Sequence, residues 1–202
     1  MEQRKFDFVK VTLEPDDYDK VKEVYRLHKE QFNKLFDLSS WVKTDDDLIN
    51  MIKDRIEYDE VLLAIDTTTG RYAGCITFHN LRICDDVIVD AEVHPVVSKR
   101  FWGQSSRDLI EDAYKFVEDN WLPINRLTAR VPSHNFGVIK LLKDVGFKVE
   151  GTLNDYYVFE DKNGNHKYYN QLIYSDINRR KWYGWKYTAT SWLCKNGRHA
   201  LD

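Results

Sequence analysis

Hydrophobic positions follow two different periods along this chain, and the period changes near residue 60. A first strand is expected over residues 6–13. Apolar residues then recur every three or four positions in two segments, which predicts two amphipathic helices. The first opens at Glu14-Pro15-Asp16, and the second opens at Thr44 with Asp47 completing a capping box. Their buried faces are expected to comprise Val21, Val24, Tyr25, His28 and Phe32, and Leu48, Ile52 and Ile56. His28 on this stripe is interpreted as a packed core histidine.

From residue 61 the period is two, which is typical of strands. Strands are predicted over 61–66, 71–83, 87–94 and 125–131, with a loop over 95–104. Two further helices carry apolar faces, and the second ends at Gly146. Residues 147–177 form a hairpin that turns at Asn163-Gly164. The order β–α–α–β–β–β–α–β–α–β–β predicts an α/β domain with a mixed sheet covered by helices. The helix faces are Leu109, Ala113, Phe116 and Val117, then Val138, Leu141, Leu142 and Val145.

Composition narrows the class of protein. A length of 202 residues favours one domain, and 30 basic against 33 acidic side chains exclude a strongly basic nucleic-acid surface. No apolar run approaches the roughly 20 residues that cross a bilayer, so no membrane partner is expected. The start of the chain lacks the apolar stretch of a signal peptide, and the three cysteines form no CxxC pair. We therefore expect a cytoplasmic protein with free thiols. The six histidines show no metal-ligand spacing, so no metal is expected.

Candidate chemistry begins on the strand over 87–94. Asp90, Glu92 and His94 share one face in a period of two, and Ile88 begins that face. Val87, Val89, Ala91 and Val93 form the other face. Either the polar face is a solvated edge, or it lines a catalytic cleft with a carboxylate or imidazole base.

Two further segments are typical of ligand sites. Arg100 to Ser105 lead into a helix, whose free N–H groups and positive dipole end can bind phosphate. The alternative is a capped helix with Ser105 as the N-cap and Asp108 at the third position. Asn135 stands at the start of the next helix, where an N-cap is the simple structural role.

In this order the segments resemble the GCN5-related N-acetyltransferase (GNAT) superfamily, and its ribosomal-protein N-terminal acetyltransferase branch most of all. The sequence VPSHNFGVIKLLKDVGFKVEGTL (131–153) resembles that branch's asparagine-to-Gly-Phe-x-x-Glu-Gly signature. AEVHP followed by RFWGQS is similar to the superfamily's acetyl-CoA loop. The resemblance covers roughly residues 60–182. Some phage-encoded acetyltransferase-like proteins carry a similar Trp-Gly-Gln loop, which suggests that this chain is phage-encoded. A phage-encoded protein would be found in the host cytoplasm or in the virion.

The resemblance implies a mostly antiparallel central sheet and an acetyl-CoA-dependent N-acetyltransferase that acts on a primary amine, of a protein rather than a small molecule. Glu92 would be the general base, acting through a water. A backbone N–H of the same strand would hold the oxyanion. The residues expected to bind acetyl-CoA are Val93 and Pro95 (pantetheine arm), Arg100, Phe101, Trp102, Gly103, Gln104 and Ser105 (pyrophosphate), and Asn135.

Departures from the family pattern keep alternatives open. Ser105 replaces the loop's second glycine, and Leu142 stands where many relatives have an acid tyrosine. Water, Tyr156 or Tyr157 would then be the acid that protonates the departing CoA thiolate. One alternative is a catalytically weak or inactive GNAT-like binding or virion-associated module. Another is an aminoglycoside-type acetyltransferase, suggested by the acidic residues between 45 and 59, for which a solvated helix face is the simpler explanation.

The two ends of the domain are assigned from composition. Residues 1–178 are expected to form a single acetyltransferase-like domain, and 179–202 a basic, aromatic C-terminal extension. Such a tail either packs on the domain or contacts a protein partner, and we favour these roles over nucleic-acid binding.

Overall fold

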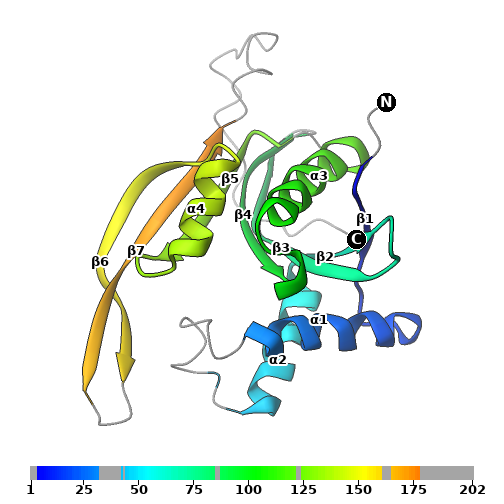
Figure 1. Cartoon of the computed structure of the whole chain (residues 1–202), viewed down its shortest axis with the longest axis horizontal. Helices are drawn as coiled ribbons and strands as arrows, with labels where there is room; N and C mark the ends of the chain where they lie inside the picture. The colour runs from blue at the N-terminus through cyan, green and yellow to red at the C-terminus, as the bar shows by residue number, and fades with distance from the viewer. Residues whose placement is uncertain are drawn as a thin grey trace.

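The computed structural model describes residues 4–31, 42, 44–84, 87–121, 124–160 and 165–177 (Figure 1). The order of its elements confirms the predicted order of strands and helices. The 3-10 turns η1 (Pro15–Asp17) and η3 (Lys99–Phe101) precede the helices α1 and α3. The strands are β1 (Phe6–Lys10), β2 (Glu60–Asp66), β3 (Tyr72–Cys84), β4 (Val87–Val97), β5 (Arg126–Pro132), β6 (Lys148–Glu160) and β7 (His166–Ile177). The helices are α1 (Tyr18–Gln31), α2 (Asp45–Tyr58), α3 (Gln104–Asn120) and α4 (Phe136–Asp144).

The described strands form one sheet in the order β1-β2-β3-β4-β5-β7-β6. Among the described strands, only the neighbours β4 and β5 are parallel, and α3 makes the crossover that a parallel pair requires. The other neighbouring pairs are antiparallel. The predicted mixed, mostly antiparallel sheet with a C-terminal hairpin is therefore confirmed.

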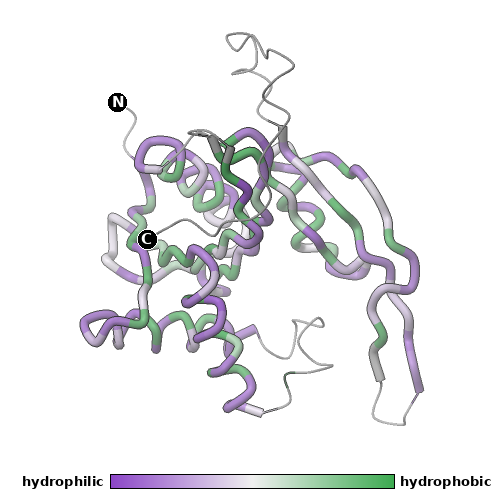
Figure 2. The backbone as a smooth tube through the Cα atoms, turned by 180° about the vertical axis from the view of Figure 1, so that it is seen from behind, coloured by the Kyte–Doolittle hydropathy of each residue, from purple (hydrophilic) through white to green (hydrophobic). Residues whose placement is uncertain are grey.

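Helices cover both faces of this sheet, because consecutive strand residues join different hydrophobic clusters. Leu62 and Ile76 pack in the cluster that contains Leu109 of α3, whereas Leu63 and Cys75 pack in the cluster of α1 and α2. In Figure 2 hydrophobic segments gather on the central strands, while the helices carry both hydrophilic and hydrophobic segments. This is the distribution expected of a sheet between two layers of amphipathic helices.

Local signals fixed the helix ends as predicted. Thr44 Oγ1 accepts the Asp47 N–H at 3.1 Å, and the Asp47 carboxylate accepts the Thr44 N–H at 2.9 Å, which completes the capping box of α2. Gly146 follows α4 with φ +100°, a conformation that favours glycine.

His28 is the packed core histidine that the periodicity predicted, only 1% exposed. Its Nδ1–H donates to the Val24 carbonyl at 2.9 Å, since a carbonyl can only accept. The other ring nitrogen, Nε2, is buried without a partner among the described residues. Burial, the largest influence, lowers the pKa of His28 to about 4, and the imidazole is therefore neutral in the fold at pH 7.

Two expectations for the strand over 87–94 were wrong. The strand continues through Pro95 to Val97, because β3 pairs with it as far as Gly74↔Val97. Proline is tolerated there because the other edge of β4 has no partner at that point among the described strands. Ile88 packs with Ala91 in the α3-side cluster instead of sharing the face of Glu92. Register shifts in the β3–β4 ladder break the strict alternation between these residues.

Several predicted features lie outside the described residues: Phe32, the hairpin turn at 161–164, the domain end at 178 and the extension over 179–202. In the part of the chain that is described, no helix is long and apolar enough to span a membrane. Cys75 is a buried free thiol, and burial raises its pKa to about 12.

Candidate active site

The parallel strands β4 and β5 pair over a very short distance and then diverge. Their register partners are Ala91↔Leu127 and Glu92↔Thr128, preceded by an isolated bridge between Ile88 and Ile124. Beyond this point β4 continues with β3, and β5 continues with β7. Figure 1 shows the two halves of the sheet separating here. Beyond this point the edges of β4 and β5 that face each other no longer pair with each other. Backbone groups on such an open edge can bind an extended ligand.

A polar cavity of about 420 Å³ lies beside the divergence, and we call it the splay cavity. Two predicted site residues line it: Glu92, the last β4 residue that pairs with β5, and Val93, the residue that follows. The remaining lining residues come from β4 itself, from four other strands and from the end of α2: Arg55, Asp59, His79, Asn80, His94, Arg130, Tyr157 and Gln171. The fold therefore brings together side chains that are far apart in the sequence.

Each carboxylate in this cavity has a basic partner. Glu92 Oε2 lies 3.2 Å from Arg130 Nε, with the Glu92 side chain 22% exposed. Asp59 Oδ2 lies 2.5 Å from His79 Nδ1. Because two arginines face these two carboxylates, the cavity is not an acidic pocket.

His94, on the same polar face of the strand as Glu92 in the sequence pattern, also lines the cavity. Arg55 Nη1 lies 2.9 Å from His94 Nδ1, and arginine can only donate, so Nδ1 accepts. Burial first and then the neighbouring Arg55 charge hold the pKa of His94 well below its usual range. His94 is therefore neutral, with its accepting lone pair already used. Asp90 does not line the cavity and instead pairs with Arg82 at 3.0 Å.

Tyr157 and Gln171 form the wall contributed by the hairpin. Gln171 Nε2 donates to Tyr157 Oη at 2.7 Å, while Gln171 Oε1 is buried without a partner among the described residues. Of the two tyrosines considered as acids, Tyr157 lies in the cavity, and Tyr156 is 52% exposed outside it. Leu142 is buried in the α3-side core and contributes packing alone.

The segment after β4 carries the predicted pyrophosphate loop. Gly103, at φ +85°, occupies the N-cap of α3 and leaves the first turn without a side-chain cap. The alternative in which Ser105 caps this helix is therefore wrong. The left-handed glycine starts the helix two residues earlier, and the Ser105 hydroxyl accepts from Lys5 Nζ at 2.9 Å. Asp108 also pairs with Lys5, at 3.0 Å.

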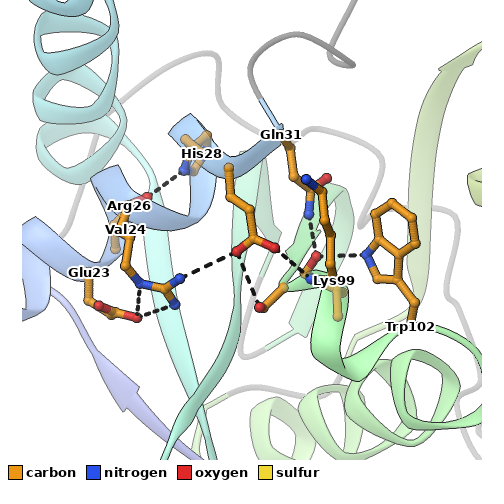
Figure 3. Close-up of polar contacts among 10 residues, drawn as sticks. Glu23, Val24, Arg26, His28, Gln31, Lys99 and Trp102 are labelled. Atoms are coloured by element: carbon orange, nitrogen blue, oxygen red, sulfur yellow. Dashed lines mark hydrogen bonds and ion pairs between the residues drawn. The ribbon is translucent and has the colours of Figure 1, made fainter.

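Helix α1 holds the base of this loop (Figure 3). Glu30 Oε1 accepts the Lys99 N–H at 2.9 Å, and Oε2 accepts the Ser98 hydroxyl at 3.2 Å. On the other side, Trp102 Nε1 donates to the Val97 carbonyl at 3.0 Å. The end of β4 and the start of the loop are therefore fixed by side chains from α1 and from the loop itself.

The other predicted loop residues point in different directions. Phe101 packs edge-on against Phe6, with ring centroids 6.0 Å apart. Phe101 and Arg100 line a second cavity, of about 910 Å³, with Arg26 and Arg71. Gln104 begins α3 and donates to Asp108 at 2.8 Å. Asn135, across the divergence from the loop, is the N-cap of α4, and its Oδ1 accepts the Val138 N–H at 3.3 Å.

His79, Arg130 and Gln171 were not predicted as site residues. Their signal could not be read from local sequence, because each reaches the cavity through strand pairing: His79 opposite Glu92, and Gln171 opposite Pro132. Within the described residues, no group of three or more potential ligands that could hold a metal ion is found.

Comparison with known proteins supports the fold. No protein-family model matches this chain, and no curated protein sequence matches it. Solved structures do match over most of the chain. A GNAT-family acetyltransferase from Streptococcus pneumoniae is 19% identical with a TM-score of 0.57, over 85% of this chain and 99% of that one. The ribosomal-protein-S5-alanine acetyltransferase from Vibrio fischeri is 13% identical with a TM-score of 0.61, over 89% and 96%.

A third structure was solved with bound ligands. The microcin C7 self-immunity acetyltransferase, in complex with acetyl-CoA and AMP, is 18% identical with a TM-score of 0.60, over 87% of this chain and 93% of that one. At these identities the comparisons establish the fold. The chain has the GNAT fold, as its sequence resemblance implied.

Proposed function

We propose that this protein is an acetyl-CoA-dependent N-acetyltransferase that acetylates a primary amine of a protein. The observation that carries the proposal is the divergence of β4 and β5 immediately after Glu92, beside a polar cavity that contains a carboxylate. An extended acyl-CoA arm requires an open strand edge, and an amine requires a proton acceptor next to it. Both requirements are met at one point of the sheet.

The fit of acetyl-CoA to the chain rests on the loop after β4. The first turn of α3 has a glycine N-cap and no capping side chain, so its N–H groups can serve an anion. In this proposal the backbone of Val93 and Pro95 binds the pantetheine arm, the loop from Arg100 to Ser105 surrounds the pyrophosphate, and Asn135 approaches from the other strand. Asn135 Oδ1 is used in capping, which leaves its amide N–H groups to donate.

Acetyl-CoA supplies an acyl thioester, and the chain has to supply a neutral amine and a site for the developing charge. Glu92 takes a proton from the substrate ammonium through a water. The amine nitrogen then forms a bond to the acetyl carbon, the carbon–sulfur bond breaks, and the second nitrogen proton goes to the CoA thiolate. A backbone N–H of β4 stabilises the oxyanion.

Two features favour a protein amine over a small cationic antibiotic. The splay cavity lies between the end of α2 and the β6–β7 hairpin, with Arg55 on one side and Tyr157 on the other. It holds as many arginines as carboxylates, whereas a polycationic antibiotic requires an acidic enclosure. Among the structural neighbours, the Vibrio fischeri enzyme is named for a ribosomal protein.

Calorimetry with acetyl-CoA tests the cofactor site. We expect micromolar binding by the full chain, weakened by both R100A and N135A. The Arg100 side chain is exposed and has no partner among the described residues, so it can turn towards a bound phosphate. If well-folded protein does not bind acetyl-CoA at millimolar concentration, the proposed enzymatic activity is overturned and a GNAT-like binding module is favoured.

Mass spectrometry of acetylated products tests whether the amine acceptor is a protein or a small molecule. The probes are tetrapeptides that begin with Ala, Ser or Met, and kanamycin as the small-molecule rival. Acetylation of the peptides alone is the expected result. Acetylation of kanamycin alone would replace the protein substrate with a small molecule.

A further inference from the structure

The splay cavity contains a histidine–aspartate pair that the scheme above does not use. Asp59, the C-cap of α2, lies with its Oδ2 2.5 Å from His79 Nδ1 on β3. The two side chains are only 18% and 17% exposed, and both line the cavity together with Glu92. A histidine oriented by a carboxylate is a common arrangement for proton transfer.

Hydrogen bonding selects the useful tautomer of this histidine. A carboxylate oxygen accepts, so the proton of the neutral imidazole lies on Nδ1 and the lone pair lies on Nε2. Nε2 of His79 has no partner among the described residues. The pair therefore presents an unused proton acceptor to the cavity.

Strand register places His79 beside Glu92. The two residues are directly opposed on β3 and β4, which puts their Cβ atoms about 4.5–5.5 Å apart on one face of the sheet. The next residue, Asn80, has φ +51° and lies at a register shift of the ladder. A bulge of this kind ends regular pairing and redirects side chains, and it is common beside active sites.

Other groups around the cavity are less suited to hold a proton. His94 already accepts from Arg55, and Glu92 is paired with Arg130. A proton on Glu92 removes the negative charge that this ion pair with Arg130 needs. The remaining titratable groups that face His79 are Tyr157 in the cavity wall and, through the core, His28 of α1.

We propose that His79 is the catalytic residue that accepts the substrate's proton from Glu92, and that Asp59 is the residue that positions His79. The proposal rests on the proposed function and deepens it. The ammonium proton passes through water to Glu92 and from Glu92 to His79 Nε2, which restores the Glu92–Arg130 pair. The Asp59 carboxylate stabilises the imidazolium, which then releases its proton to solvent. The bonds made and broken at the acetyl group are unchanged.

Steady-state kinetics with the tetrapeptide probes test this role. In H79Q we expect kcat to fall about 100-fold at neutral pH, the lower end of general-base losses, with acetyl-CoA affinity unchanged. The rate should recover at alkaline pH, where the amine is already neutral, and added imidazole should partly rescue H79A. H166Q, the same change at an exposed histidine on β7, is the matched control and should retain full activity.

Asp59 is tested by a readout that a purely structural role would not move. Because Asp59 acts through His79, D59N should lower kcat in the wild type and have no further effect in the H79Q background. Full activity of H79Q at neutral pH, or an equal fold-loss from D59N in the wild type and in H79Q, would overturn the relay while leaving the acetyltransferase proposal in place.

Long-range proton–nitrogen NMR of the full chain tests the pair without any acceptor substrate. The H79Q spectrum identifies the His79 signals, which in the neutral form of the imidazole should show a proton on Nδ1 and none on Nε2. A proton on Nε2 instead would overturn the inference. A correct tautomer in a protein that binds no acetyl-CoA and acetylates no probe would overturn the proposed function, and the relay with it.

Discussion

At the scale of single residues, Glu92 combines a position at the strand divergence with an ion pair to Arg130. The E92Q variant keeps the shape of the side chain and removes its proton-accepting charge. We expect acetyl-CoA affinity to stay nearly unchanged and turnover to fall roughly 10²–10⁴-fold. Calorimetry and initial rates measure the two effects. E57Q, at an exposed position of α2, is the control, and full activity of E92Q would exclude Glu92 as the base.

His28 gives a prediction about stability and pH. The folded protein keeps His28 neutral down to about pH 4, whereas the unfolded chain binds a proton near pH 6.5. The unfolded state therefore takes up more protons in this window, and the free energy of unfolding falls as the pH decreases from 6.5 to 4. The contribution of His28 amounts to about 3 kcal/mol.

Urea unfolding of the wild type and of H28L at pH 7 and pH 4.5 measures this contribution. The loss on acidification should be smaller in H28L, because only the wild type carries the titrating group. His94 acts in the same direction in both proteins, so the difference between them isolates His28. An equal loss in both proteins would contradict the assignment.

At the scale of elements, α1 positions the loop through Glu30. The E30Q variant removes the charge that accepts the Lys99 N–H and the Ser98 hydroxyl. We expect a loss of about 1 kcal/mol in acetyl-CoA binding, or about fivefold in Kd, because the loop is then less well ordered before binding. Turnover at saturating acetyl-CoA should be unchanged.

The control for E30Q is E23Q on the same helix, because Glu23 pairs with Arg26 and does not contact the loop. Calorimetry compares the two variants with the wild type. Equal affinity of E30Q and the wild type would show that α1 does not position the binding loop.

At the scale of the whole molecule, acetyl-CoA should stabilise the protein by joining the two halves of the sheet. At a concentration 100 times Kd the ligand adds about 2.7 kcal/mol to the free energy of unfolding. For a domain of this size that corresponds to a rise in Tm of roughly 5–10 °C. Thermal unfolding followed by circular dichroism measures the shift. Acetyl phosphate, which lacks the pantetheine and nucleotide portions, is the control and should leave Tm unchanged.

Much of the architecture was readable from local signals. Capping chemistry predicted the start of α2 at Thr44 and the end of α4 before Gly146. The change of hydrophobic period located the strands. These predictions succeeded because hydrogen bonds and side-chain periodicity within one element depend on residues close in sequence. Ser105 failed as a cap for a local reason, since Gly103 could adopt a left-handed conformation two residues earlier.

The sequence by itself determined the order of elements, the α/β class and the polar face that carries Glu92. Tertiary structure alone decided which side chains meet that face. Arg130 and Gln171 reach the splay cavity through the pairing of distant strands, and His79 on β3 meets its partner Asp59 at the end of α2. Strand register and the β4–β5 divergence are collective outcomes of packing on both sheet faces, and no short stretch of sequence encodes them.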